Sequence, residues 1–215
     1  MEIVVFDLET SGTSRSPNQE VIIAISAVRM KVGRLDEVQR FDTLTPFSGP
    51  LPSWLKPAGL VDRARTEAMI SFSRFVGDAW LVADRGPSDK MPFIHEECVR
   101  SGLPTREVRV LDTGDFARKL WADFSLGSLH DLSRRLGLSA QEDEFCEIDQ
   151  KEKLLAEVVH RMWEKLAPNF EVCPVGSCMG FLPACCGNES HAFTTSRQSA
   201  NVLPDSRKTK PLDRR

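Results

Sequence analysis

The sequence predicts an α/β domain, and three observations support this fold class. Over the first two-thirds of the 215 residues, short apolar runs rich in Ile and Val alternate with segments of helical spacing. Hydrophobic residues make up 41% and charged residues 27%, which are ordinary values for a globular protein and exclude a fully disordered chain. The length suffices for one domain with a sizeable core and an extension.

Three apolar runs open the chain, and each predicts a strand. The first covers Glu2 to Leu8 and the second Val21 to Met30. Gly33 marks a turn, after which Glu37 to Leu44 predicts the third strand. Because short connections join these strands, we expect an antiparallel meander.

Helices and strands alternate after the proline-rich segment from Pro46 to Pro57. Further strands are predicted at Ala79 to Ala83 and Val108 to Leu111. Helices are predicted at Thr66 to Val76, Lys90 to Ser101, Thr113 to Trp121, Leu129 to Leu136 and Ile148 to Leu166. One face of the last helix is apolar and is expected to face the core. It consists of Leu154, Leu155, Val158, Val159 and Met162.

The composition changes near Pro168, so we predict a domain over residues 1–167 and a flexible, Cys-containing tail over residues 168–215. Four of the six cysteines lie in this tail, at Cys173, Cys178, Cys185 and Cys186. Their spacing matches no standard pair of zinc knuckles, which favours free thiols over a zinc site.

Charge and hydropathy restrict the function classes. No stretch approaches the roughly 18 apolar residues of a membrane helix, and the start lacks the features of a signal peptide, so a cytoplasmic protein without a membrane partner is expected. The net charge of −3 lacks the basic excess typical of nucleic-acid-binding proteins. It still permits an enzyme that meets nucleic acid through metal ions held by carboxylates.

The strongest chemical signal is Asp7-Leu8-Glu9 at the end of the first strand. Residues i and i+2 of a strand share a face, so the carboxylates of Asp7 and Glu9 project side by side. Two negative charges this close are costly without a cation between them, and hard divalent cations prefer oxygen ligands. Spacing alone leaves two alternatives open, a Mg²⁺ or Mn²⁺ site and a strand end with solvated acids.

The segment VVFDLETSG resembles the first motif of the DEDD superfamily of 3′→5′ exonucleases, which includes ribonuclease T and the proofreading subunit of bacterial DNA polymerase III. The resemblance extends from about Glu2 to Leu166. It implies a ribonuclease-H-like exonuclease fold with a mixed five-stranded sheet flanked by helices. It also implies a hydrolase that uses one or two Mg²⁺ or Mn²⁺ ions on single-stranded 3′ ends of nucleic acid. A DNA polymerase or another replication or repair protein is an expected partner.

The second motif of that branch, Ala-His-Asn-Ala-x-Phe-Asp, is similar to Ala83–Asp89 of this chain. The resemblance implies that Asp89 is a catalytic metal ligand together with Asp7 and Glu9. From the residues alone, an ordinary helix cap after Pro87-Ser88 is the favoured interpretation of Asp89.

This sequence departs from the family at several motif positions. Asp84 and Arg85 replace the His-Asn pair of the second motif, and Ala24 stands where the family has a glutamate. In the third motif, Cys146 aligns with the general-base histidine and Lys151 with the fourth carboxylate. Asp149 is a candidate substitute for that carboxylate, although a shift of two helical residues turns a side chain by about 200°.

Two function hypotheses follow. The first is a 3′→5′ exonuclease weakened at its general base, in which Lys151 contacts a phosphate directly. The second is a catalytically inactive module on the same fold that binds nucleic acid or a protein partner. A structural protein unrelated to nucleic acid ranks last, because the first motif is hard to reproduce by chance.

Overall fold

The computed structural model describes residues 1–12, 16–32, 34–50, 61–125, 127–138, 148–166 and 178–183. Its strands are β1 (Glu2–Thr10), β2 (Ile22–Lys31), β3 (Arg34–Leu44), β4 (Val61–Asp62), β5 (Trp80–Ala83), β6 (Thr105–Asp112) and β7 (Cys178–Pro183). Its helices are α1 (Arg65–Val76), η1, a short π-helix (Gly86–Lys90), α2 (Met91–Arg100), α3 (Thr113–Leu120), α4 (Leu129–Arg135) and α5 (Ile148–Leu166). No helix in these ranges is long and apolar enough to cross a bilayer.

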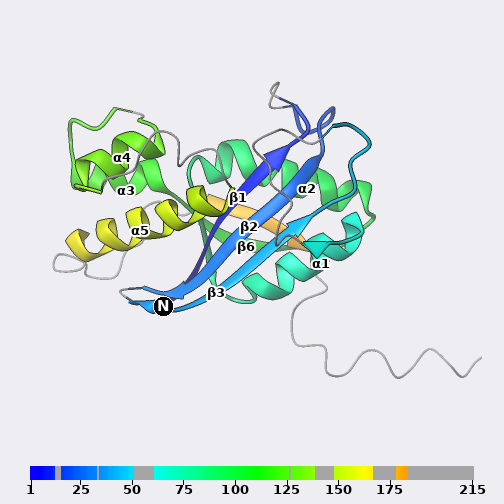
Figure 1. The fold of residues 1–215 in the computed structure, drawn as a ribbon, viewed down its shortest axis with the longest axis horizontal. Helices are drawn as coiled ribbons and strands as arrows, with labels where there is room; N and C mark the ends of the chain where they lie inside the picture. Colours follow the sequence, from blue (N-terminus) through cyan, green and yellow to red (C-terminus); the bar gives the residue numbers. More distant parts are fainter. Residues whose placement is uncertain are drawn as a thin grey trace, which may run out of the picture.

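The strands form one mixed sheet in the order β4-β3-β2-β1-β5-β6-β7 (Figure 1). The first three strands form the predicted antiparallel meander, while β5 lies parallel to β1 and β6 parallel to β5. This arrangement confirms the predicted α/β class and mixed sheet. The sheet has seven strands rather than five, because β4 adds two residues beside β3 and β7 adds an edge strand beside β6.

Strand β7 comes from the segment predicted as a flexible tail, so that prediction was wrong for these six residues. It pairs antiparallel with β6, from Thr105 opposite Pro183 to Val110 opposite Cys178. Packing rather than local periodicity places it: Leu182 is fully buried, and a Cβ on Gly180 would come within 2.6 Å of Val110. The other tail residues, with Cys173, Cys185 and Cys186, lie outside the described residues.

Helices cover both faces of the sheet. Helices α1 and α2 pack on the face that receives Val4 and Phe6, whereas α3, α4 and α5 pack on the face that receives Ile3 and Val5 (Figure 1). Because side chains alternate along a strand, Asp7 and Glu9 continue the face of Ile3 and Val5. The sequence therefore directs this acid pair toward the α5 side.

Helix α5 has the bounds predicted from the sequence. Four residues of its predicted apolar face are buried, namely Leu155, Val158, Val159 and Met162, and Leu154 is half-buried. The helix packs on β1, β2 and β3 and on α3 and α4. This packing fixes the first turns of α5 beside the end of β1.

Candidate active site

A pocket of about 470 Å³ lies where β1 and β5 end, against the beginning of α5. Ligands of open α/β sheets bind at the carboxyl ends of parallel strands, which is where this pocket lies. Its charged lining consists of four carboxylates and three cationic side chains: Asp7, Glu9, Asp84, Asp89, Arg85, Lys90 and Lys151. The three predicted acids Asp7, Glu9 and Asp89 thus line one pocket.

Glu9 lies on the α5 side of β1, as its place in the strand predicts. Its side chain is 13% exposed, and Lys151 Nζ of α5 lies 3.0 Å from Glu9 Oε1. Burial raises the pKa of Glu9, and the neighbouring Asp7 raises it further, while the Lys151 ammonium acts in the opposite direction. A cation beside Glu9 therefore favours its ionised form.

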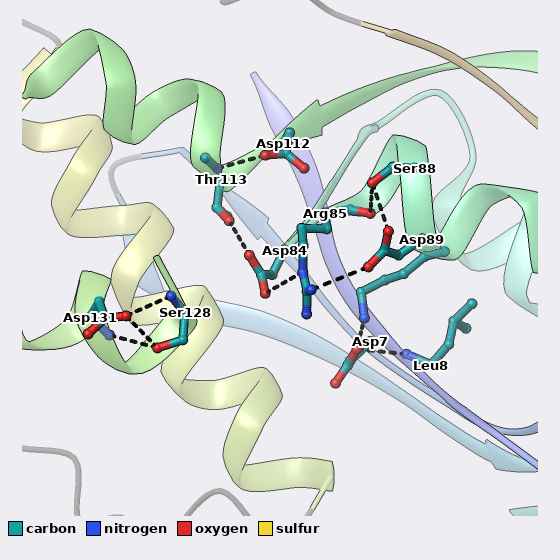
Figure 2. A network of polar contacts seen from close by, with 12 residues as sticks. Asp7, Leu8, Asp84, Arg85, Ser88, Asp89, Asp112, Thr113, Ser128 and Asp131 are labelled. Atoms are coloured by element: carbon teal, nitrogen blue, oxygen red, sulfur yellow. Dashed lines mark hydrogen bonds and ion pairs between the residues drawn. The ribbon is translucent and has the colours of Figure 1, made fainter. Parts of the chain in front are cut away.

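Asp7 has its own ammonium partner, because Lys90 Nζ contacts Asp7 Oδ1. The same oxygen accepts a hydrogen bond of 2.9 Å from the backbone N–H of Leu8 (Figure 2). Sequence reasoning missed Lys90, although its position directly after the second-motif Asp89 was a usable signal. Lys90 and Lys151 come from different elements and meet adjacent carboxylates of one strand.

Asp89 belongs to η1 and pairs with Arg85, whose Nη1 lies 3.5 Å from Asp89 Oδ2 (Figure 2). Ser88 Oγ donates a hydrogen bond of 2.9 Å to the other oxygen of Asp89. Among the described non-glycine residues, Arg85 alone has a positive φ, of 51°. This backbone conformation costs about 1 to 2 kcal/mol for a residue with a side chain. This strained turn places Asp84, Arg85 and Asp89 together on the pocket wall.

Asp84 and Arg85 are tied to the scaffold. Asp84 Oδ1 accepts a hydrogen bond of 3.2 Å from Thr113 Oγ1 at the start of α3, and Asp84 Oδ2 lies 3.7 Å from Arg85 Nε (Figure 2). Where the family's second motif has a His-Asn pair, this chain therefore has a carboxylate and a guanidinium that contact each other. Each of the two also lines the pocket.

The remaining predicted positions contribute less. Ala24 lies opposite Glu9 in the β1–β2 pairing and is fully buried, so a methyl group occupies this position of β2. Asp149 lies in the first turn of α5, but its side chain is outside the described part, as is all of Cys146. The fourth carboxylate stays a prediction.

A buried acid next to the pocket escaped sequence analysis. Glu152 follows Lys151 and is fully buried, and Ser26 Oγ lies within hydrogen-bond distance of both Glu152 Oε2 and Asp42 Oδ1. Burial raises the pKa of Glu152 to about 7. Ser26 has one hydroxyl proton and can donate it to only one of these two carboxylates. Both contacts are hydrogen bonds when Glu152 is protonated and donates to Ser26 Oγ, while Ser26 donates to Asp42. No local sequence pattern distinguishes Glu152 from a solvated helix acid.

The donor set fits a hard divalent cation in kind, because carboxylates of β1 and η1 line one pocket. Within the described ranges, however, no group of three His, Cys, Asp or Glu side chains is arranged to hold a metal ion. Asp7 and Glu9 each contact an ammonium group instead. A cation that bound to both would have to displace Lys90 and Lys151.

Comparisons with known proteins relate the chain to DNA polymerases. No family model matches the sequence. The PolC-type DNA polymerase III of Streptococcus suis is 29% identical over 153 residues, which cover 68% of this chain. That of Halalkalibacterium halodurans is 31% identical over 146 residues, or 64% of this chain. The matched part spans 10% of the length of these curated relatives.

Solved structures resemble the fold. A 3′-exonuclease from a structure of 3′-end specific recognition of a histone mRNA stem-loop has a TM-score of 0.58 and 15% identity, over 76% of this chain and 63% of that chain. The nuclease domain of 3′hExo, a DEDDh family member bound to rAMP, has a TM-score of 0.57 and 12% identity, over 76% of this chain and 92% of that chain. The chain therefore has the ribonuclease-H-like exonuclease fold of these structures, and its sequence is similar to part of the PolC-type DNA polymerases.

Proposed function

We propose that the protein hydrolyses phosphodiesters at the 3′ ends of nucleic acids with the help of a divalent metal. One observation carries this proposal: Asp7, Glu9 and Asp89 line one pocket at the ends of the parallel strands. The fold is shared with proteins that are named as 3′-exonucleases. The similarity to PolC-type polymerases supports a polymerase or another replication or repair protein as a partner.

In this mechanism the three acids Asp7, Glu9 and Asp89 would hold Mg²⁺ or Mn²⁺, with Asp149 as a candidate fourth ligand. When bound, the metal would activate a water molecule and stabilise the leaving 3′ oxygen. Arg85 lies on the same wall and is suited to orient phosphate oxygens, because its guanidinium presents several donors.

Turnover is expected to be slow. Among the described residues that line the pocket there is no histidine, and Cys146 stands at the position that aligns with the general base. Loss of a general base typically lowers a rate by about 10² to 10⁴-fold. A measurable rate therefore requires a long incubation and an excess of enzyme.

The test is hydrolysis of a 3′-labelled single strand with Mg²⁺ or Mn²⁺, for the wild type and Asp7→Ala. We expect shortening from the 3′ end that requires the metal, and a rate at least roughly 10²-fold lower for Asp7→Ala. Asp78→Ala is the matched control, because Asp78 is exposed in the turn before β5, at the opposite end of that strand. Equal product from the wild type and Asp7→Ala, or none from either, contradicts catalysis by this site.

A second candidate function is supported by the ion pairs Lys90–Asp7 and Lys151–Glu9. A module that binds a nucleic-acid end or a protein partner without turnover would need cations in the pocket but no metal. A labelled single strand that binds in the presence of a chelator, and stays intact with Mn²⁺, would favour this module over the enzyme.

A further inference from the structure

The pocket holds two ammonium groups where the proposed metal would lie. Lys90 contacts Asp7, and Lys151 contacts Glu9 at 3.0 Å. Together these two lysines supply the charge of one divalent cation to the same two carboxylates. The described residues thus already neutralise the acid pair that defines the proposed site.

Partial burial strengthens both ion pairs. The side chains of Asp7 and Glu9 are 14% and 13% exposed, and those of Lys90 and Lys151 are 17% and 30% exposed. Charges in such positions are screened less by water and salt than charges on the open surface. Lys90 is held by η1 and Lys151 by α5, so each ammonium is delivered by a regular element of the scaffold.

We propose that Lys90 and Lys151 are resident counter-ions that compete with a divalent cation for Asp7 and Glu9. This inference rests on the site of the proposed function, but it concerns what fills that site when the metal is absent. A cation must displace both ammonium groups to contact both carboxylates, so the lysines lower its affinity. The same contacts keep Asp7 and Glu9 from repelling each other without a metal.

The displaced ammonium groups have a natural new partner. Both side chains line the pocket, and a lysine ammonium can turn on its flexible stem toward a phosphate oxygen. A nucleic-acid phosphate would therefore stabilise the state in which the carboxylates are free for the cation. Because coupling between two ligands is reciprocal, phosphate and cation should strengthen each other's binding.

The first experiment measures Mn²⁺ affinity by calorimetry, without nucleic acid, for the full chain and for Lys90→Gln and Lys151→Gln. Each substitution removes one positive charge within contact distance of a ligand oxygen, so we expect binding that is roughly tenfold tighter. Lys119→Gln is the matched control, because Lys119 is exposed on α3 and does not line the pocket; its affinity should equal that of the wild type. Thermal unfolding of each variant verifies that it is folded.

The second experiment repeats the Mn²⁺ titration in the presence of adenosine 5′-monophosphate. We expect the nucleotide to tighten Mn²⁺ binding in the wild type, and to do so less in a variant that carries both Lys90→Gln and Lys151→Gln. Direct contact between metal and phosphate is common to both proteins, so the difference between them isolates the contribution of the lysines. An equal gain in both proteins would overturn the role assigned to the displaced lysines.

The outcomes separate this inference from the proposed function. Unchanged or weaker Mn²⁺ binding in folded Lys90→Gln and Lys151→Gln, or no Mn²⁺ binding in any variant, overturns the competition. Tighter binding supports it even if the wild type hydrolyses no nucleic acid. Hydrolysis that needs Asp7, with Mn²⁺ affinity indifferent to both lysines, leaves the function standing and removes the inference.

Discussion

Acids in two regions of the molecule meet cationic partners, but with different burial. In the pocket, Glu9 is slightly exposed and contacts the single ammonium group of Lys151. On the other face of the sheet, Glu97 of α2 is fully buried and lies 3.5 Å from Arg65 and 3.6 Å from Arg100. The first pair lines the pocket, whereas Glu97 is fully buried and does not line it.

The two arginines also hold backbone groups. Arg65 Nη1 donates to the carbonyl of Ile22 at 3.1 Å, and Arg100 Nη1 donates to the carbonyl of Glu20 at 2.9 Å. Glu97 therefore fastens α1 and α2 to the start of β2 and the segment before it. The guanidinium has several donors in a fixed plane, while the ammonium is a flexible point charge. Carboxylate–cation pairs thus stabilise the fold where they are buried, as at Glu97. Beside the pocket, as at Glu9, we expect the cationic partner to be replaceable.

The largest effect should come from breaking the buried network with Glu97→Gln. Removal of one partner from a buried ion pair leaves uncompensated charge and costs roughly 3 to 4 kcal/mol of the free energy of unfolding, which urea denaturation measures. Glu96→Gln on the same helix should cost less than about 1 kcal/mol, because Glu96 and its partner Arg100 are partly exposed. Equal losses in both variants would contradict the fastening role of Glu97. Mn²⁺ affinity should be the same in both.

Glu152 sharpens the comparison, because it is buried like Glu97 but has one guanidinium, that of Arg40, at 3.7 Å. Burial raises its pKa from the usual 4.5 to about 7. The folded protein thus binds this proton more tightly than the unfolded chain does. The contribution of this bound proton to the free energy of unfolding is complete below pH about 4.5. It is lost as the pH rises through 7, which lowers the free energy of unfolding by about 3 kcal/mol at most.

The measurement is the free energy of unfolding between pH 4.5 and 8.5, for the wild type and Glu152→Gln. The neutral amide cannot ionise, so the variant should lose most of the decrease seen in the wild type over this range. Glu164→Gln, an exposed position on the same helix, should keep the decrease. A wild-type decrease that persists unchanged in Glu152→Gln would rule out Glu152 as its source.

The smallest effect on stability is expected for Lys151→Gln. The Lys151–Glu9 pair is partly exposed, so its loss should change the free energy of unfolding by less than about 1 kcal/mol. The same variant should show the tighter Mn²⁺ binding described above. A loss of several kcal/mol in urea denaturation would mean that the pocket pairs fasten the fold as Glu97 does, and the contrast between the two regions would disappear.

Local periodicity was sufficient to predict much of the fold. The meander, the bounds of α5 and the shared face of Asp7 and Glu9 all follow from repeats of 2 or 3.6 residues, which neighbouring residues alone establish. Strand β7 could not be predicted in this way, because its Cys, Gly and Pro residues show little alternation and its place depends on the edge of β6.

The sequence by itself determined that two carboxylates would project side by side from the end of β1, on the face that also carries Ile3 and Val5. Only the tertiary structure decided which charges they meet. Glu9 and Lys151 are separated by 142 residues, and Ser26 and Glu152 by 126. Periodicity fixes the direction of a side chain within its own element, but the packing of α5 and η1 against the sheet brings an ammonium group to each carboxylate.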